Sequence, residues 1–142
     1  MRRFVGPGLG LLLGGVAAFP VAAQRSSDAP ALVVLEEPRP DPVLPAALVP
    51  FVIASDVCRR GHTPRVALRV YNVFAQPVAS LRLRDRRSAV VLDSIPMRCG
   101  QYVALWDGTV AGGTRAASPG VYYLRLSVDE RSTSKKIIVT PP

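Results

Sequence analysis

The fold is decided by one stretch of the chain, residues 100–126, which reads GQYVALWDGTVAGGTRAASPGVYYLRL. Apolar residues alternate with others at both ends of this stretch, a pattern typical of half-buried strands: Tyr102, Ala104 and Trp106 at the first end, Tyr122, Leu124 and Leu126 at the second. Asp107 can accept hydrogen bonds from turn amides, and the glycine after it can take positive φ. The pair Gly112-Gly113 fits a tight hairpin. The stretch therefore predicts strands joined by turns, with Trp106 as a large core side chain.

On either side of this stretch the chain continues as short β-prone runs separated by turn residues. The runs cover residues 49–56, 65–73, 78–84, 89–92, 101–106, 121–128 and 135–140. No window beyond residues 1–23 shows the 3.6-residue stripe of an amphipathic helix. Short strands at this spacing predict an all-β domain, a two-sheet sandwich of about seven strands, which we place at residues 51–142.

Residues 24–50 are rich in proline and are interpreted as a linker. Proline fixes φ and removes a backbone donor, so this segment is expected to be extended and largely unpaired. One exception is the apolar run at residues 31–35, which is expected to be an isolated strand with no partner of its own. A strand on a flexible arm can add to the sheet edge of a second subunit, so self-assembly through residues 31–35 is one hypothesis.

A motif within residues 100–126 resembles a known family. Its residues are Trp106, Asp107 and Gly108, followed by Gly120, Val121 and Tyr122. Together they resemble the Ig-like domain of flagellar hook-capping proteins, a β-sandwich type that also forms the C-terminal sorting domains of type IX secretion cargo. The resemblance extends to residues 66–78 and 135–139. It implies an Ig-like sandwich that docks, spaces or adheres.

The chain departs from that family at two places. The hairpin turn between the strands at residues 66–78 usually carries glycine where this chain has Ala75, and positive φ is costly for alanine. The two cysteines, Cys58 and Cys99, are not part of the family's common pattern.

Residues 1–23 have the organisation of a cleavable secretory signal peptide. Two arginines precede an apolar stretch, and small residues precede Gln24, so cleavage is predicted after Ala23. Two alternatives stay open. The first is an uncleaved anchor, which the glycines in the apolar stretch disfavour. The second is the twin-arginine route, whose motif is incomplete. No later segment reaches the roughly 18 apolar residues of a membrane span, so the protein is expected in the periplasm, at the cell surface or outside the cell.

Cys58 and Cys99 are expected to form a disulfide in an oxidising compartment. The bridge would close a loop of about 40 residues and stabilise the fold by up to about 4 kcal/mol. The alternative is a metal site at Cys58, His62 and Cys99, although a fourth ligand is not evident. Calcium binding by Asp107 is a second metal hypothesis, although no Asp-rich loop surrounds this residue. We expect neither a metal nor a cofactor.

The chain carries 18 basic and 10 acidic residues, a net charge of +8. Arginines gather in its middle, and the candidate polyanion patch consists of Arg59, Arg60, Arg82, Arg84, Arg86 and Arg87. The alternative interpretation is a solvated, arginine-rich face. No aromatic residues alternate with these arginines as they do in platforms that stack single strands, so no specific nucleic-acid partner is expected.

The sequence contains no catalytic motif. His62 is the only histidine, and no nucleophile turn, phosphate-binding loop or His-Glu-x-x-His metal motif is present. We therefore predict a non-enzymatic structural or interaction module of the cell envelope or exterior, with a protein or a cell-surface polymer as partner. The alternatives are a type IX sorting domain, a hook cap, a filament subunit and a polyanion-binding protein. The signal peptide disfavours the hook cap, and the short linker disfavours the sorting domain.

Overall fold

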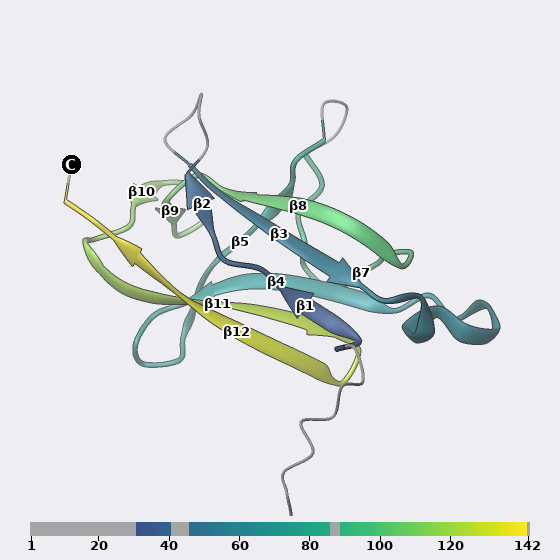
Figure 1. Ribbon diagram of the computed structural model, residues 1–142. Coiled ribbons are helices and arrows are strands. Elements are labelled where there is room, and N and C mark those ends of the chain that lie inside the picture. The colour runs from purple at the N-terminus through teal and green to yellow at the C-terminus, as the bar shows by residue number, and fades with distance from the viewer. Residues whose placement is uncertain (1–30, 41–45, 86–88, 142) are drawn as a thin grey trace, which may run out of the picture. The chain divides into compact units, whose positions relative to one another are not determined.

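Figure 1 shows the computed structural model, which describes residues 31–40, 46–85 and 89–141. The predicted signal peptide, its cleavage site after Ala23, and the arginines at 86 and 87 lie outside these residues. The described chain forms antiparallel β-sheets with one short 3₁₀ helix. Two of these sheets have five strands each, and both contribute to one core. The prediction of an all-β chain is therefore confirmed.

The first sheet, here called sheet A, has the strand order β1-β3-β8-β6, and β2 also pairs with β3. Its strands are β1 (Val33–Leu35), β2 (Arg39–Pro40), β3 (Ala47–Ile53), β6 (Arg82–Leu83) and β8 (Gly100–Trp106). β3 is its central strand, because it pairs with β8 along its whole length on one side and with β1 and β2 on the other.

Within the predicted linker, residues 33–35, 39–40 and 47–50 are paired strands of sheet A, so the prediction is wrong for these residues; residues 24–30 and 41–45 lie outside the described part of the chain. Residues 33–35 pair with residues 51–53 of β3, and Leu35 is only 4% exposed. β8 covers one edge of β3, and β1 covers the edge that would otherwise stay open. Pro50 interrupts this second ladder between β1 and β2: its carbonyl accepts from the N–H of Glu36, but proline has no N–H to return. The described residues from Ala31 onward therefore belong to one compact unit.

The second sheet, here called sheet B, has the strand order β12-β11-β4-β5, and β7 also pairs with β4. Its strands are β4 (Arg65–Tyr71), β5 (Pro77–Ser80), β7 (Ile95–Pro96), β11 (Gly120–Val128) and β12 (Arg131–Val139). The run at residues 78–84, predicted as one strand, is divided between the two sheets. The chain leaves sheet B after β5 and enters sheet A at β6, and Leu81 between them is fully buried.

One apolar core lies between the sheets. The inward positions predicted for Trp106, Leu124 and Leu126 are confirmed, whereas Tyr102 and Tyr122 are only half-buried. The core side chains that are at most 1% exposed include Val49, Phe51, Ile53, Val66, Leu68, Val70, Leu124, Leu126 and Val128. Each is worth about 1.5–3 kcal/mol relative to an exposed position. Among the described residues no polar or charged side chain is buried. The polar groups of these residues therefore lie at the surface, where a site has to be sought.

Two small elements connect the strands. The 3₁₀ helix η1 (Ser55–Gly61) follows β3. The hairpin of β9 (Thr109–Val110) and β10 (Arg115–Ala116) lies between β8 and β11. Its turn contains Gly112 and Gly113, with φ of 69° and 87°, as the sequence predicts.

Candidate interaction face

The Trp-Asp-Gly part of the motif is a structural turn. The buried Trp106 donates its indole N–H to the carbonyl of Thr109 at 2.9 Å. Asp107 Oδ1 accepts from the hydroxyl of Thr109 at 2.6 Å and from its backbone N–H at 2.9 Å. These hydrogen bonds, the hydroxyl first, lower the pKa of the Asp107 carboxyl. Gly108 takes φ of 77°, as predicted. Among the described residues, no three His, Cys, Asp or Glu side chains are grouped as a metal would need.

The second part of the motif holds the start of β11 in place. Gly120 is the first residue of this strand, and Val121 is half-buried beside it. The ring of Tyr122 meets Trp106 edge-on, with centroids 5.8 Å apart, and its hydroxyl donates to the carbonyl of Ser118 at 2.8 Å. The motif residues therefore serve the fold.

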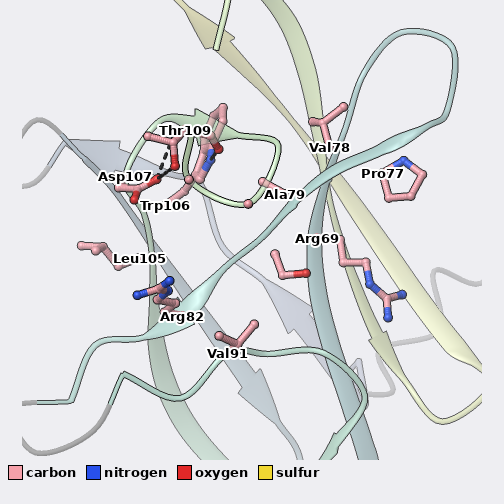
Figure 2. Close-up of a pocket in the computed structure, with 13 residues that line it drawn as sticks. Arg69, Pro77, Val78, Ala79, Arg82, Val91, Leu105, Trp106, Asp107 and Thr109 are labelled. Carbon is pink, nitrogen blue, oxygen red and sulfur yellow. Dashed lines mark hydrogen bonds between the residues drawn. The ribbon is translucent and has the colours of Figure 1, made fainter. Parts of the chain in front are cut away.

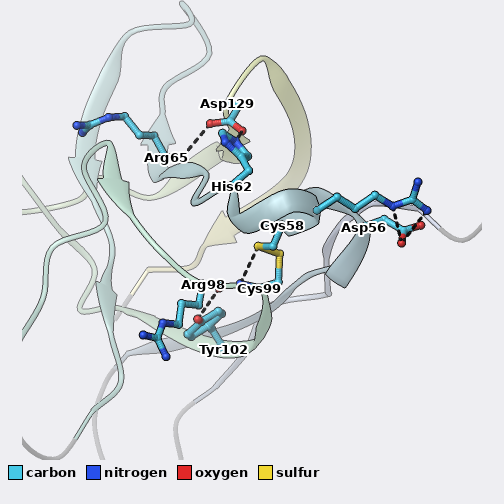
Figure 3. Close-up of a disulfide and its surroundings, with 9 residues drawn as sticks. Asp56, Cys58, His62, Arg65, Arg98, Cys99, Tyr102 and Asp129 are labelled. Carbon is cyan, nitrogen blue, oxygen red and sulfur yellow. Dashed lines mark hydrogen bonds and ion pairs between the residues drawn. A yellow bond between two sulfur atoms is a disulfide. The ribbon is translucent and has the colours of Figure 1, made fainter.

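Cys58 and Cys99 form the predicted disulfide, which ties η1 to the residue before β8 (Figure 3). Their Cα atoms are 6.0 Å apart, and the N–H of Cys99 donates to Sγ of Cys58 at 3.1 Å. The metal site at Cys58, His62 and Cys99 is excluded here, because the two sulfurs are bonded to each other. His62 instead places Nε2 2.7 Å from Asp129 Oδ2.

Asp129 links the loop after η1 to the turn between β11 and β12 (Figure 3). One carboxylate oxygen contacts His62, and the other accepts from the backbone N–H of Arg65 at 2.9 Å. The hydrogen bond with His62, and after it the bond from Arg65, lowers the pKa of Asp129. These hydrogen bonds therefore stabilise the loop more strongly when the Asp129 carboxylate is ionised.

Two arginines of the candidate polyanion patch, Arg59 and Arg60, lie far from a third, Arg82, while Arg84 follows β6 and bonds through its N–H to the carbonyl of Val103 in the middle of β8. Ile53, two residues before η1, lies opposite Gly100. Arg82 lies opposite Leu105 near the other end of β8, about 17 Å along the strand. Arg59 and Arg60 follow Ile53 on η1, so they are at the other end of sheet A from Arg82. Arg59 is paired with Asp56 at 3.2 Å.

A different set of side chains comes together on the outer face of sheet B. β4 points Val66, Leu68 and Val70 into the core, so the residues between them point outward. The register places Tyr71 opposite Tyr123 and Tyr123 opposite Lys136; Arg69 is opposite Arg125, and Arg125 is opposite Ser134. We call these six residues the tyrosine–arginine face: Arg69, Tyr71, Tyr123, Arg125, Ser134 and Lys136. Directly opposed side chains on neighbouring strands are within contact range.

The tyrosine–arginine face has a positive charge excess. Arg69 is paired with the carboxylate of Asp93, and that hydrogen bond is the main reason why its pKa is raised. Arg125 donates to Oγ of Ser132 at 3.2 Å, which leaves other N–H groups of its guanidinium for a ligand. Within residues 31–40, 46–85 and 89–141, no carboxylate is within ion-pair distance of Arg125 or Lys136.

One end of this face is apolar. Phe74 and Val73, in the turn between β4 and β5, are 79% and 62% exposed. Ile138 on β12 is 60% exposed, and it lies one row from Tyr123, which is 41% exposed. The turn that presents Phe74 contains Ala75 with φ of 58°, a left-handed conformation that is costly for alanine.

A hollow of about 220 Å³ lies where the tyrosines and the turn meet. It is lined by Tyr71, Asn72, Val73, Ala75, Tyr123, Arg125 and Ser134. The hollow therefore combines two aromatic rings, a guanidinium and a hydroxyl at the surface. Asn72 shapes the turn, because its Oδ1 accepts from the N–H groups of Phe74 and Gln76 at 3.0 Å each.

Figure 2 shows a larger cleft of about 420 Å³ where the chain crosses from β5 to β6. Val78, Val91 and Leu105 contribute apolar walls, and Arg82 lies beside Leu105. Two other charged groups of this cleft already have partners: Asp107 binds Thr109, and the partner of Arg69 is Asp93. The smaller hollow is the better candidate site, because it joins two tyrosine rings to the guanidinium of Arg125, which has no carboxylate partner among the described residues, whereas Arg82 in the cleft is close enough to Asp107 to act on its carboxylate.

Searches of protein-family models, of curated proteins and of solved structures found no match to this chain. No helix in the described part of the chain has the length and apolar character needed to cross a membrane.

The tyrosine–arginine face was missed in the sequence because its residues come from strands far apart in the chain. Tyr71 and Tyr123 are separated by more than one-third of the sequence and meet only through the pairing of β4 with β11. A signal was present: Arg69, Tyr71, Tyr123 and Arg125 alternate with the core residues of their strands. Had β4 and β11 been recognised as partners from the sequence, these four residues would have fallen on one surface.

Proposed function

We propose that this chain is an exported, non-enzymatic interaction module of the cell envelope or exterior, which docks through the outer face of sheet B. The observation that carries the proposal is the exposure of Phe74, Val73 and Ile138 at one end of that face. Large apolar side chains gathered at a surface are typical of interaction sites. Phe74, Val73 and Ile138 are the most exposed of the large apolar side chains in the described part of the chain.

Export is supported by the disulfide and by the predicted signal peptide. Disulfides persist in secreted and periplasmic proteins and are rare in the cytosol. The Cys58–Cys99 bridge joins segments 41 residues apart and is the only use of cysteine in the chain. Both features favour the periplasm, the cell surface or the exterior.

We further propose that the domain is Ig-like and related in fold to the hook-capping type. The turn geometry at Trp106 and Asp107, the hairpin at Gly112-Gly113 and the antiparallel strand at residues 131–139 support this relationship. Fold alone does not establish function, so the docking proposal rests on the exposed face.

Co-sedimentation tests the proposal. The protein, purified from an exporting host with its disulfide formed, is mixed with cell envelopes of the organism that produces it. We expect binding that falls at least about fivefold in the double variant Phe74→Ser/Ile138→Ser, because the apolar contact area is lost. Val34→Ser is the matched control, since Val34 is 37% exposed but belongs to β1 of sheet A. Equal losses in both variants, or no binding by the unaltered protein, would overturn the proposal.

A further inference from the structure

The hollow at Tyr71 and Tyr123 has the dimensions of a subsite for one sugar ring. Its volume is about 220 Å³, below the roughly 300–1,000 Å³ of pockets that take drug-sized ligands. It is lined from the outer face of sheet B, where β11 and β12 stay paired from Gly120 to Val128, so a ligand can extend beyond it along these strands. This shape suits one unit of a linear polymer better than a whole small molecule.

The chemistry of the hollow matches a sugar that bears a carboxylate. The C–H faces of pyranose rings pack on aromatic rings, which Tyr71 and Tyr123 supply side by side. Guanidinium groups bind carboxylates in bidentate geometry, and Arg125 is in the same hollow. Lys136 lies opposite Tyr123 on the next strand, where it can pair with a second anionic unit. Ser134 adds a hydroxyl for the sugar's own hydroxyl groups.

We propose that the tyrosine–arginine face binds an acidic polysaccharide, with one uronic acid ring in the hollow and its carboxylate on Arg125. This inference rests on the proposed docking function and names its ligand class. Charge complementarity favours a polyanion, because Arg125 and Lys136 have no carboxylate partner among the described residues. The hollow also carries the hydroxyl groups of Tyr71, Tyr123 and Ser134, which can bond to the hydroxyl groups of a sugar and which an apolar protein surface would leave without partners.

Calorimetric titration with a hexamer of galacturonic acid tests this inference, using the exported, disulfide-bonded protein. The methyl ester of the same hexamer is the ligand control, because it keeps the rings and removes the charges. We expect the acid to bind at least about tenfold more tightly than the ester, since a charged hydrogen-bonding partner is lost. Raising the salt from about 20 to 200 mM is expected to weaken the acid and leave the ester nearly unchanged.

The variant Arg125→Gln is expected to lower affinity for the acid at least about tenfold, and Tyr123→Ser to lower affinity for both ligands. Arg115→Gln is the matched control, because Arg115 is exposed on β10, outside the face. Circular dichroism shows whether each variant is folded, and Lys136→Gln gives a second probe if Arg125→Gln is not. No binding of the acid, equal affinity for the ester, or an equal loss in Arg115→Gln would overturn the inference.

Two further outcomes separate this inference from neighbouring ideas. Tighter binding of a single-stranded oligonucleotide than of the hexamer would overturn the polysaccharide assignment. Envelope binding that depends on Phe74 and Ile138, combined with no hexamer binding, would overturn the ligand and leave the docking function standing. Hexamer binding that depends on Arg125, without any envelope binding, would overturn the docking function alone.

Discussion

Loss of the Cys58–Cys99 disulfide is expected to remove much of the domain's stability. The cysteines are 41 residues apart in sequence. In the chain-entropy treatment, a cross-link over that length lowers the entropy of the unfolded chain by about 13 cal/mol/K, or about 4 kcal/mol at 25 °C. Domains are typically stable by only about 5–15 kcal/mol, so the double variant Cys58→Ser/Cys99→Ser should unfold at a much lower denaturant concentration.

Urea unfolding, followed by tryptophan fluorescence, measures this loss. Trp106 is the only tryptophan and is buried, so its emission reports the opening of the core. Serine at position 58 retains an acceptor for the N–H of residue 99, which now bonds Sγ of Cys58, so the variant mainly tests the cross-link. The m-value should rise, because an unfolded chain without the bridge exposes more surface.

The reasoning fails if the double variant loses less than about 1 kcal/mol of unfolding free energy with an unchanged m-value. The bridge would then not restrict the unfolded chain. Unaltered protein reduced with dithiothreitol is the internal control, and its unfolding curve should match that of the double variant.

Three further predictions concern single residues. Leu35→Ala should lower the unfolding free energy by about 2–4 kcal/mol in urea titrations, because it leaves a cavity in the core; a loss below about 1 kcal/mol would mean that β1 is detached in solution. Ala75→Gly should raise the midpoint, with a gain of about 0.5–1 kcal/mol, since glycine accepts φ of 58°; a loss would contradict the turn geometry. The folded-state pKa of Asp129 is lowered by His62 and Arg65, so its stabilising effect is present above its unfolded pKa of about 3.9 and is lost as pH falls through the folded value. Asp129→Asn should therefore be less stable than the unaltered protein at pH 6, and the two should converge near pH 2; a constant difference would refute this assignment.

The faces of the strands were predictable from the sequence, because side-chain direction in a strand has a period of two residues. Val66, Leu68 and Val70 follow that period, and all three are buried. The turn at Asp107 was predictable for a similar reason, since its hydrogen bonds reach only to Thr109. Both features depend only on residues close together in the sequence, so they could be predicted without knowing which strands pair.

Pairing partners were not predictable in this way. The prolines of residues 24–50 predict a linker. However, β1 buries Leu35 and forms backbone hydrogen bonds by pairing with the edge of β3, and neither would be possible in an extended segment in solvent. Leu81 looked like the middle of one strand, although its burial coincides with the passage between sheets. The arginine-rich stretch was also misleading, because Arg60 lies on η1, beyond one end of β3, whereas Arg82 pairs near the opposite end of β8.

The first and last strands lie near each other, and Glu37 after β1 is paired with Lys135 on β12 at 2.8 Å (Figure 1). A chain that emerges N-terminus first, from a ribosome or from a translocation channel, therefore cannot complete this seam until β12 has emerged. The two cysteines emerge well before β12 does, so oxidation can precede closure of the domain. Until β12 has emerged, one edge of β11 stays unpaired and the core side chains that contact Ile137 and Val139 stay uncovered, so the domain closes only after that strand is free to pair.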